Sequence, residues 1–167
     1  PAPDEDVLAD RYEQTDTRLT EAGLRWYEIS NWAASDEARC GHNRAYWRRG
    51  DWWGAGPGAH SHVAGVRWWN VKHPTAWAQR VTAGEVPEAG REELTPEQRR
   101  LEWLVLQGRL AEGLPAEELD AGAVAQLEGD GLVERREDRV VLTLRGRMLA
   151  DTVALQLDQA MGSVSTP

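Results

Sequence analysis

One stretch of the chain, residues 40–61, limits most strongly what the protein can fold into. It holds two histidines, four tryptophan or tyrosine rings and five glycines within 22 residues. From Arg39 to Gly50 the chain carries four arginines and no acidic residue. A hydrophobic core does not need this mixture. A site for a flat anionic ligand would use it, because rings stack on such a ligand, arginines pair with carboxylates and glycines let the backbone approach.

Composition places the chain among globular proteins and narrows its partners. Of the 167 residues, 41% are hydrophobic and 28% are charged, and the formal net charge is −9. A chain of this size and composition can bury a sizeable core. The acidic balance argues against nucleic acid or an anionic membrane surface as partner. The sequence has neither an apolar run of membrane-spanning length nor the pattern of a signal peptide.

Cysteine occurs once, at Cys40. A single cysteine excludes an internal disulfide and any self-contained metal site of three or four thiolates. It fits the reducing environment of the cytoplasm, where we expect the protein to act. The first residue is proline rather than methionine, which suggests a piece of a longer chain.

The first part of the chain predicts a helix, a short strand and a long loop. Residues 4–22 place apolar side chains at three- and four-residue steps, and Gly23 ends the predicted helix. Residues 24–29 alternate as a strand does, so that helix and strand make half of an α/β repeat. Residues 30–51 have weak periodicity and predict a long loop.

The middle of the chain predicts two strands and a helix. We expect the strands at residues 51–55 and 66–71, and a helix at residues 74–83 that begins with a proline. Residues 86–93 are polar and contain a proline and a glycine. We therefore place the domain boundary there.

The C-terminal part predicts helices around a hairpin. A capping box starts a helix expected at residues 95–112. Two short helices and a hairpin follow, at residues 115–119, 121–129, 132–136 and 139–144. A last helix is expected at residues 143–159, with its inward face formed by Leu149, Val153 and Leu157. This order of elements predicts a winged-helix-like domain, so the fold class is α/β plus α.

His42 and the residues after it form a first candidate site. A histidine can bind haem iron, and Tyr46 and Trp47 could stack on a porphyrin. Nearby arginines could pair with its carboxylates; they are Arg39, Arg44, Arg48 and Arg49. A loop histidine that makes a structural hydrogen bond explains the same residues, and spacing alone does not separate the two interpretations.

The segment Gly54-Ala-Gly-Pro-Gly58 is a second candidate site. Glycines after a strand let backbone amides approach a ligand, but dinucleotide-binding spacing and the Lys-Ser/Thr of a P-loop are missing. A turn at the end of a barrel strand is the alternative. The next residues, His60-Ser61-His62, do not indicate a catalytic triad, because adjacent side chains point apart in extended chain. No carboxylate lies at ligand spacing from these histidines, which disfavours a metal site.

The winged-helix outline also suggests DNA binding. The expected recognition helix, Ala121–Glu128, contains no lysine or arginine. The basic cluster of the domain is Arg135, Arg136 and Arg139, and a solvated hairpin explains it. We therefore expect an accessory role for this domain and no nucleic-acid partner.

Three parts of the sequence together resemble a known family. They are Tyr27-Glu-Ile-Ser-Asn-Trp-Ala33, the stretch at residues 40–61 and the helical C-terminal domain. They are similar to the oxygen-independent coproporphyrinogen III oxidase-like radical SAM family, and more narrowly to its HemW branch, the haem chaperones. The pattern His-Asn-x-x-Tyr-Trp at residues 42–47 is characteristic of that branch. The resemblance covers the chain from about residue 5.

The resemblance implies a fold and cofactors. Full-length members have a partial (β/α) barrel and a helical C-terminal domain, and they hold a 4Fe–4S cluster and S-adenosylmethionine. Their cluster loop, Cys-x-x-x-Cys-x-x-Cys, lies in an N-terminal part that this chain lacks. Residues 1–88 would then be the last part of the barrel with the haem-motif loop, and residues 89–167 the winged-helix-like domain. Alone, this chain should be inactive as a radical enzyme.

The resemblance also implies site residues and a function. Haem would contact His42, Asn43, Arg44, Tyr46, Trp47 and Arg48, with His42 as the possible iron ligand. A turn near S-adenosylmethionine would comprise Gly54, Gly56, Gly58, His60 and Ser61. The implied function is to bind haem for transfer to haem-requiring proteins, some of them membrane-associated. The alternative is a coproporphyrinogen III oxidase, which decarboxylates two propionate side chains by radical chemistry.

Overall fold

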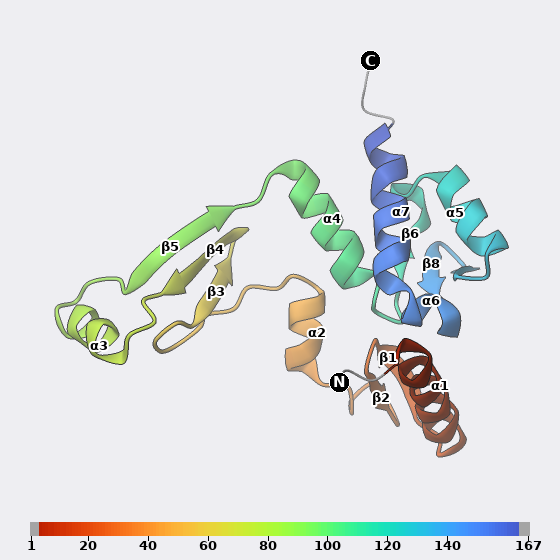
Figure 1. The fold of residues 1–167 in the computed structure, drawn as a ribbon, viewed down its shortest axis with the longest axis horizontal. Coiled ribbons are helices and arrows are strands. Elements are labelled where there is room, and N and C mark those ends of the chain that lie inside the picture. The colour runs from red at the N-terminus through yellow and green to blue at the C-terminus, as the bar shows by residue number, and fades with distance from the viewer. Residues whose placement is uncertain (1–3, 164–167) are drawn as a thin grey trace. The chain divides into compact units, whose positions relative to one another are not determined.

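The computed structural model describes residues 4–163 (Figure 1). Its elements group into two compact units. One unit runs up to Arg48 and resumes at Arg100, and the other is Arg49–Arg99. These divisions differ from the domain boundary that we expect near residue 88. The N-terminal elements therefore share a unit with the C-terminal region.

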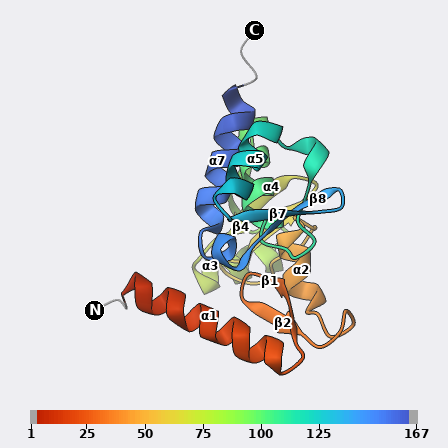
Figure 2. The same ribbon diagram turned by 90° about the vertical axis from the view of Figure 1, so that its right-hand side faces the viewer.

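Helix α1, Glu5–Glu21, and strand β1, Arg25–Glu28, confirm the predicted start of the chain. Asp4 caps α1, since its side chain accepts a hydrogen bond from the amide of Asp6 at 3.1 Å. Strand β1 pairs antiparallel with β2, Asn31–Ala33. Figures 1 and 2 show α1 lying beside β1.

Residues 30–51 are not the long loop that the sequence predicts. They contain β2 and a helix, α2, Gly41–Trp47. Strand β2 has three residues and α2 has seven, so neither is long enough to show a repeating apolar pattern. None of the α2 residues is fully buried, which removes the signal by which helices are usually recognised.

Arg147 joins the N-terminal elements to the C-terminal helices. Its side chain is 7% exposed, and its guanidinium group lies 2.8 Å from the carboxylate of Asp16 in α1. It also stacks over Trp26 of β1, 4.5 Å from the ring centroid. Burial alone would raise the pKa of Asp16, but hydrogen bonds from Arg147 and Trp32 lower it below its ordinary value. Burial also raises the pKa of the neighbouring Tyr12, against the opposing charge of Arg147.

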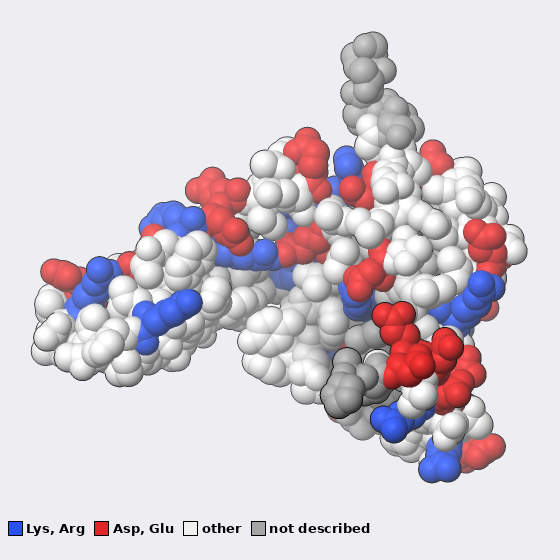
Figure 3. Space-filling view, viewed as in Figure 1, with Lys and Arg blue, Asp and Glu red and all other residues white. Residues whose placement is uncertain are grey.

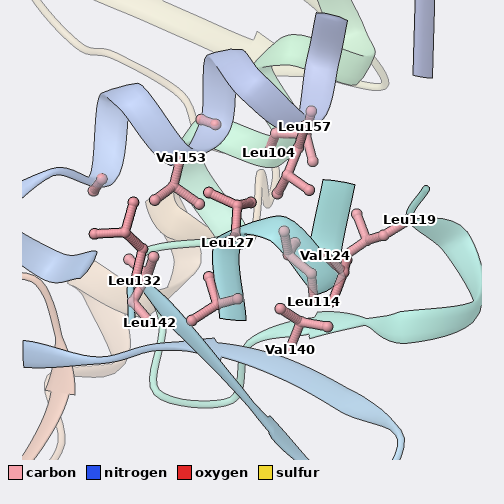
Figure 4. Close-up of a cluster of buried hydrophobic side chains, with 13 residues drawn as sticks. Leu104, Leu114, Leu119, Val124, Leu127, Leu132, Val140, Leu142, Val153 and Leu157 are labelled. Atoms are coloured by element: carbon pink, nitrogen blue, oxygen red, sulfur yellow. The ribbon is translucent and has the colours of Figure 1, made fainter. Parts of the chain in front are cut away.

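The C-terminal region folds around one hydrophobic core. Figure 4 shows this core between the helices and the strands; Leu104, Leu127 and Leu157 are each at most 2% exposed. Strands β6, β8 and β7 form a sheet in that order. The elements are α4 (Pro96–Gln107), β6 (Leu114–Pro115), the 3₁₀-helix η1 (Ala116–Glu118), α5 (Ala121–Gly129), β7 (Val133–Arg136), β8 (Arg139–Leu142), α6 (Leu144–Met148) and α7 (Ala150–Ser163). The short helical segments and the hairpin confirm the prediction.

Two predicted helix boundaries in this region are wrong. Helix α4 ends at Gln107, before residue 112. The last predicted helix is divided at Leu149, which is 40% exposed rather than inward-facing, although Val153 and Leu157 are buried.

The division follows from a separate anchor for α6. The Thr143 side chain caps this helix by accepting a hydrogen bond from the amide of Gly146 at 3.0 Å. Gly146 packs against the carbonyl oxygen of Leu132, and a Cβ at this glycine would lie 1.8 Å from that oxygen. The close approach fixes α6 on the hairpin, and α7 starts in a new direction.

The unit Arg49–Arg99 is built on a three-stranded antiparallel sheet with the order β3–β4–β5. Its elements are β3 (His60–Val63), β4 (Val66–Asn70), α3 (Pro74–Thr82) and β5 (Glu88–Glu93). The positions of β4 and α3 confirm the prediction.

One strand predicted for this unit is absent, and another strand lies where the sequence predicts none. Residues 51–55 do not form a strand; Trp52 makes an isolated bridge with His62. Residues 86–93, where we place the domain boundary, contain strand β5, which pairs with β4. Strand β5 lies at the edge of the sheet and exposes most of its residues, so it needs no apolar side chains that would reveal it. Within residues 4–163, no helix has both the length and the apolar character to cross a membrane.

Candidate functional site

Helix α2 carries the His-Asn-x-x-Tyr-Trp pattern. It begins after Cys40, whose side chain makes no capping hydrogen bond. The backbone amide of Cys40 instead donates to the hydroxyl oxygen of Tyr27 at 3.2 Å. Since α2 has seven residues and buries none of them fully, polar contacts rather than a hydrophobic face hold it in place.

The side chains of His42 and Tyr46 form an exposed pair on α2. Their rings meet edge to face, with centroids 4.8 Å apart. Residues four apart lie on the same face of a helix, which explains the contact. Asn43 is half-buried beside them. An exposed imidazole next to an aromatic ring can accept a flat ligand that carries a metal ion.

The arginines around α2 converge on Glu112, in the segment between α4 and β6. The Glu112 Oε1 atom lies 2.7 Å from Arg44, 3.1 Å from Arg48 and 3.3 Å from Arg39. Arg39 also pairs with Asp36 at 2.7 Å. Sequence reasoning assigned these guanidinium groups to a ligand, but in the structure a carboxylate of the chain itself binds all three.

The structure does not bring the rings and the guanidinium groups together on one face. Arg44 follows His42 by two residues, which places the two side chains about 200° apart around a helix. His42 and Tyr46 face solvent, whereas Arg44 points to Glu112. The single aromatic and cationic surface inferred from the sequence is therefore divided between two faces of α2.

Trp47 packs against the C-terminal region. Its half-buried ring lies under the guanidinium group of Arg109, 6.0 Å from the ring centroid. Arg109 itself pairs with Asp151 at 2.6 Å and donates to the carbonyl oxygen of Val105. Trp47 thus anchors the C-terminal end of α2.

The glycine-rich turn lies in the other unit and is held by its own hydrogen bonds. The Gly54 amide donates to Ser61 Oγ at 3.0 Å, and the Gly58 amide donates to the carbonyl oxygen of Val71 at 2.9 Å. The Asn70 side-chain amide donates to the Gly56 carbonyl oxygen at 2.9 Å. These amides are therefore engaged within the protein. The proximity of the glycine-rich turn to S-adenosylmethionine stays a prediction.

A glycine is required at position 54 by the approach of another backbone segment. A Cβ there would lie 1.9 Å from the carbonyl oxygen of His60. Ser61 is fully buried beneath the turn, and the ring of His60 lies near Trp69, with centroids 5.9 Å apart. His62 is buried, with Nδ1 3.3 Å from the carbonyl oxygen of Gly50. These contacts are structural, and in the described part of the chain no group of three or more His, Cys, Asp or Glu could hold a metal ion.

Sequence reasoning missed Glu112 and gave no role to Glu28. Glu28 is 1% exposed, accepts a hydrogen bond from the Ser30 amide at 3.2 Å and another from the Asn31 side chain. The carboxylate therefore closes the turn between β1 and β2. Glu28 could have been identified, because it lies within the segment Tyr27–Ala33 that resembles the family. Nothing in the local sequence distinguishes Glu112 from other acidic residues at the surface.

Comparison with known proteins agrees with this architecture. Residues 94–149 match the HemN C-terminal domain. The haem chaperone HemW of Mycobacterium tuberculosis is 48% identical over 159 residues, which span 93% of this chain and 40% of that protein. The haem chaperone HemW of Bacillus subtilis is 29% identical over 163 residues, 90% of this chain and 42% of its own length.

The chain is related to HemN- and HemW-like proteins. It spans about 40% of the length of these two HemW relatives. The solved structure of coproporphyrinogen III oxidase (HemN) from Escherichia coli, a radical SAM enzyme, has the same fold, with a TM-score of 0.65 and 19% identity. The match covers 95% of this chain and 42% of the oxidase. The similarity to HemW therefore covers nearly all of this chain but less than half of the length of each HemW relative.

Proposed function

We propose that this chain is part of a haem chaperone that binds haem for transfer to haem-requiring proteins. The observation that carries the proposal is the exposed pair of His42 and Tyr46 on α2. The imidazole of His42 supplies an axial ligand to the haem iron, and the ring of Tyr46 lies against the porphyrin. The identity to HemW over 93% of the chain supports this assignment.

The two faces of α2 have different roles in this proposal. Asn43 borders the His42 face and can donate a hydrogen bond to the bound haem. Trp47 supports the helix from beneath, through its contact with Arg109. Arg44 and Arg48 can bind a haem propionate only if their ion pairs with the Glu112 side chain break. In this proposal, His42 binds the haem iron before any arginine of α2 contacts a propionate.

We further propose that residues 1–88 are the last part of a radical SAM barrel and that residues 89–167 form a winged-helix-like domain. The shared fold with HemN supports the first assignment, and the helix–hairpin order of the elements from α4 onward supports the second. Strand β5, Glu88–Glu93, pairs with β4 across the proposed boundary. The residues present do not fit a 4Fe–4S cluster, because Cys40 is the one cysteine of the sequence and such a cluster takes several thiolates. Other parts of the full-length relatives would hold the cluster and S-adenosylmethionine. The lone cysteine also supports a reducing, cytoplasmic location.

A haem titration tests the proposal. The chain should develop a Soret band of ligated haem, and His42→Ala should weaken or shift that band. His73 is a matched control, because it is an exposed histidine outside the pattern, at the start of α3. His73→Ala should bind like the wild type.

Equal spectra for all three proteins would overturn the assignment of His42. A separate assay addresses the oxidase alternative. Decarboxylation of coproporphyrinogen III by a reconstituted protein of the relatives' full length that carries this sequence would favour the oxidase over the chaperone.

A further inference from the structure

The Glu112 carboxylate contacts three guanidinium groups through a single oxygen atom. Arg39, Arg44 and Arg48 all approach Oε1, at 3.3, 2.7 and 3.1 Å. The Glu112 side chain is 29% exposed, so the cluster is open to solvent on one side. Asp36 offsets only part of the remaining positive charge, since its own side chain is 81% exposed. The cluster therefore has an excess of positive charge in a chain whose net charge is −9.

The guanidinium groups are incompletely satisfied by this arrangement. An arginine presents five N–H donors and binds a carboxylate best through two parallel hydrogen bonds. Glu112 contacts each of the three arginines through Oε1, and among the described residues the buried Nε of Arg44 has no hydrogen-bond partner. A carboxylate that enters with both oxygens would satisfy more of these donors.

The backbone at Glu112 is fixed, whereas its side chain can move. The Arg139 Nε atom donates to the Glu112 carbonyl oxygen at 3.1 Å. The side chain is partly exposed and can turn toward solvent without disturbing that contact. If the Glu112 contacts were lost, α2 would still be held by the packing of Trp47 against Arg109 and by the hydrogen bond from Cys40 to Tyr27.

We propose that Arg39, Arg44 and Arg48 form a carboxylate-binding site that Glu112 occupies when no ligand is bound. A propionate carboxylate of a porphyrin displaces the Glu112 side chain, and no covalent bond forms or breaks. The choice of a porphyrin as the carboxylate donor rests on the proposed function. Glu112 is then a competitor built into the chain, which lowers affinity for the ligand's acidic edge and favours release of the cargo.

A metal-free porphyrin separates this site from the iron ligand. Protoporphyrin IX has two free propionates, whereas its dimethyl ester has none. Fluorescence titration should show that Glu112→Gln binds the free acid roughly tenfold more tightly than the wild type, since a charged competitor has been removed. Affinity for the ester should not change. Glu112→Gln combined with Arg44→Gln should lose the gain.

Two controls keep the outcome interpretable. Glu117 is exposed in η1, so Glu117→Gln removes one negative charge elsewhere and should leave both affinities unchanged. Glu112→Asp retains the charge with a shorter reach, and should raise affinity for the free acid less than Glu112→Gln does. It also serves if Glu112→Gln does not fold.

The proposal is overturned if neither Glu112 variant gains affinity for the free acid, or if acid and ester gain equally. Because this probe contains no iron, His42→Ala should leave its binding unaltered. Loss of the haem Soret response with a retained free-acid gain would overturn the proposed iron site alone. A His42-dependent Soret band without the gain would overturn the carboxylate site alone.

Discussion

At the scale of single residues, a buried ion pair connects the N-terminal helix α1 to the C-terminal helix α6. Arg147 contacts Asp16 at 2.8 Å and the ring of Trp26 at 4.5 Å. Removing one partner of such a pair leaves the other buried without compensation, which usually costs more than the pair contributes. The pairing of α1 with α6 therefore depends on the ionisation of one carboxylate.

Asp16→Asn should change how the stability of the protein depends on pH. Hydrogen bonds from Arg147 and Trp32 lower the pKa of Asp16 in the folded state, against the effect of burial. A carboxylate with a lowered pKa stabilises the fold above its unfolded pKa, and this contribution is lost as the pH falls through the folded value. Urea unfolding from pH 7 to pH 2.5 should show a wild-type advantage that begins to fall near the unfolded pKa of about 4 and is lost as the pH drops further, through the lower pKa of the folded state.

Asp10→Asn is the matched control for this experiment. Asp10 lies on the same helix but is exposed, and its replacement should leave the pH profile as it is. A difference between Asp16→Asn and the wild type that stays constant at all pH values would contradict the assigned role of Asp16.

At the scale of elements, the short helices α2 and α6 are held in place by tertiary contacts that cannot be predicted from their own sequences. Helix α6 depends on the approach of Gly146 to the Leu132 carbonyl oxygen. Helix α2 depends on Glu112 and Arg109. Neither five nor seven residues give a helix that is stable by itself, so each takes its position from tertiary contacts.

Gly146→Ala should destabilise the protein by about 1–3 kcal/mol, as is typical of overpacking. The added Cβ would lie 1.8 Å from the Leu132 carbonyl oxygen, so α6 must shift off the hairpin. Gly129, in α5, serves as the control, because a Cβ added there would meet no atom within 4 Å. Gly129→Ala should be neutral or slightly stabilising, because alanine favours the helix. Equal unfolding midpoints in urea would contradict the steric argument.

The sequence predicts best those elements whose burial follows a period. The buried positions Val153 and Leu157, four residues apart in α7, follow this rule. Helix α4 is instead predicted by its capping box, and the hairpin at β7 and β8 by the turn between its two strands. The sequence of the edge strand β5 does not indicate a strand, because its exposed residues need not be apolar. For the candidate site, the pattern identifies His42 and Tyr46, but the partner of the arginines lies about 70 residues farther along the chain. A contact between residues so far apart cannot be predicted from the local sequence.

At the scale of the whole molecule, charge decides which partners are disfavoured. Figure 3 shows acidic side chains gathered over α1, and the first turn of that helix contains Glu5 and Asp6. The net charge is −9. In the C-terminal hairpin, Arg135 and Arg136 are each paired with a glutamate, at 3.3 and 2.5 Å. The hairpin therefore presents little unbalanced positive charge to a phosphate backbone.

The chain should not retard duplex DNA in a gel at physiological salt. Helix α5 has no basic residue with which to contact phosphates, and the net charge repels them. Retardation that weakens as salt is raised would contradict this expectation and would favour a regulatory role for the C-terminal domain.

The exposed thiol of Cys40 immediately precedes α2, and the sequence has no other cysteine. A maleimide fluorophore would therefore attach at a single, known position, two residues from the imidazole that we assign to iron. Haem quenches nearby dyes by energy transfer, so a dye on this thiol would report optically on the binding and release of the haem that we propose as ligand.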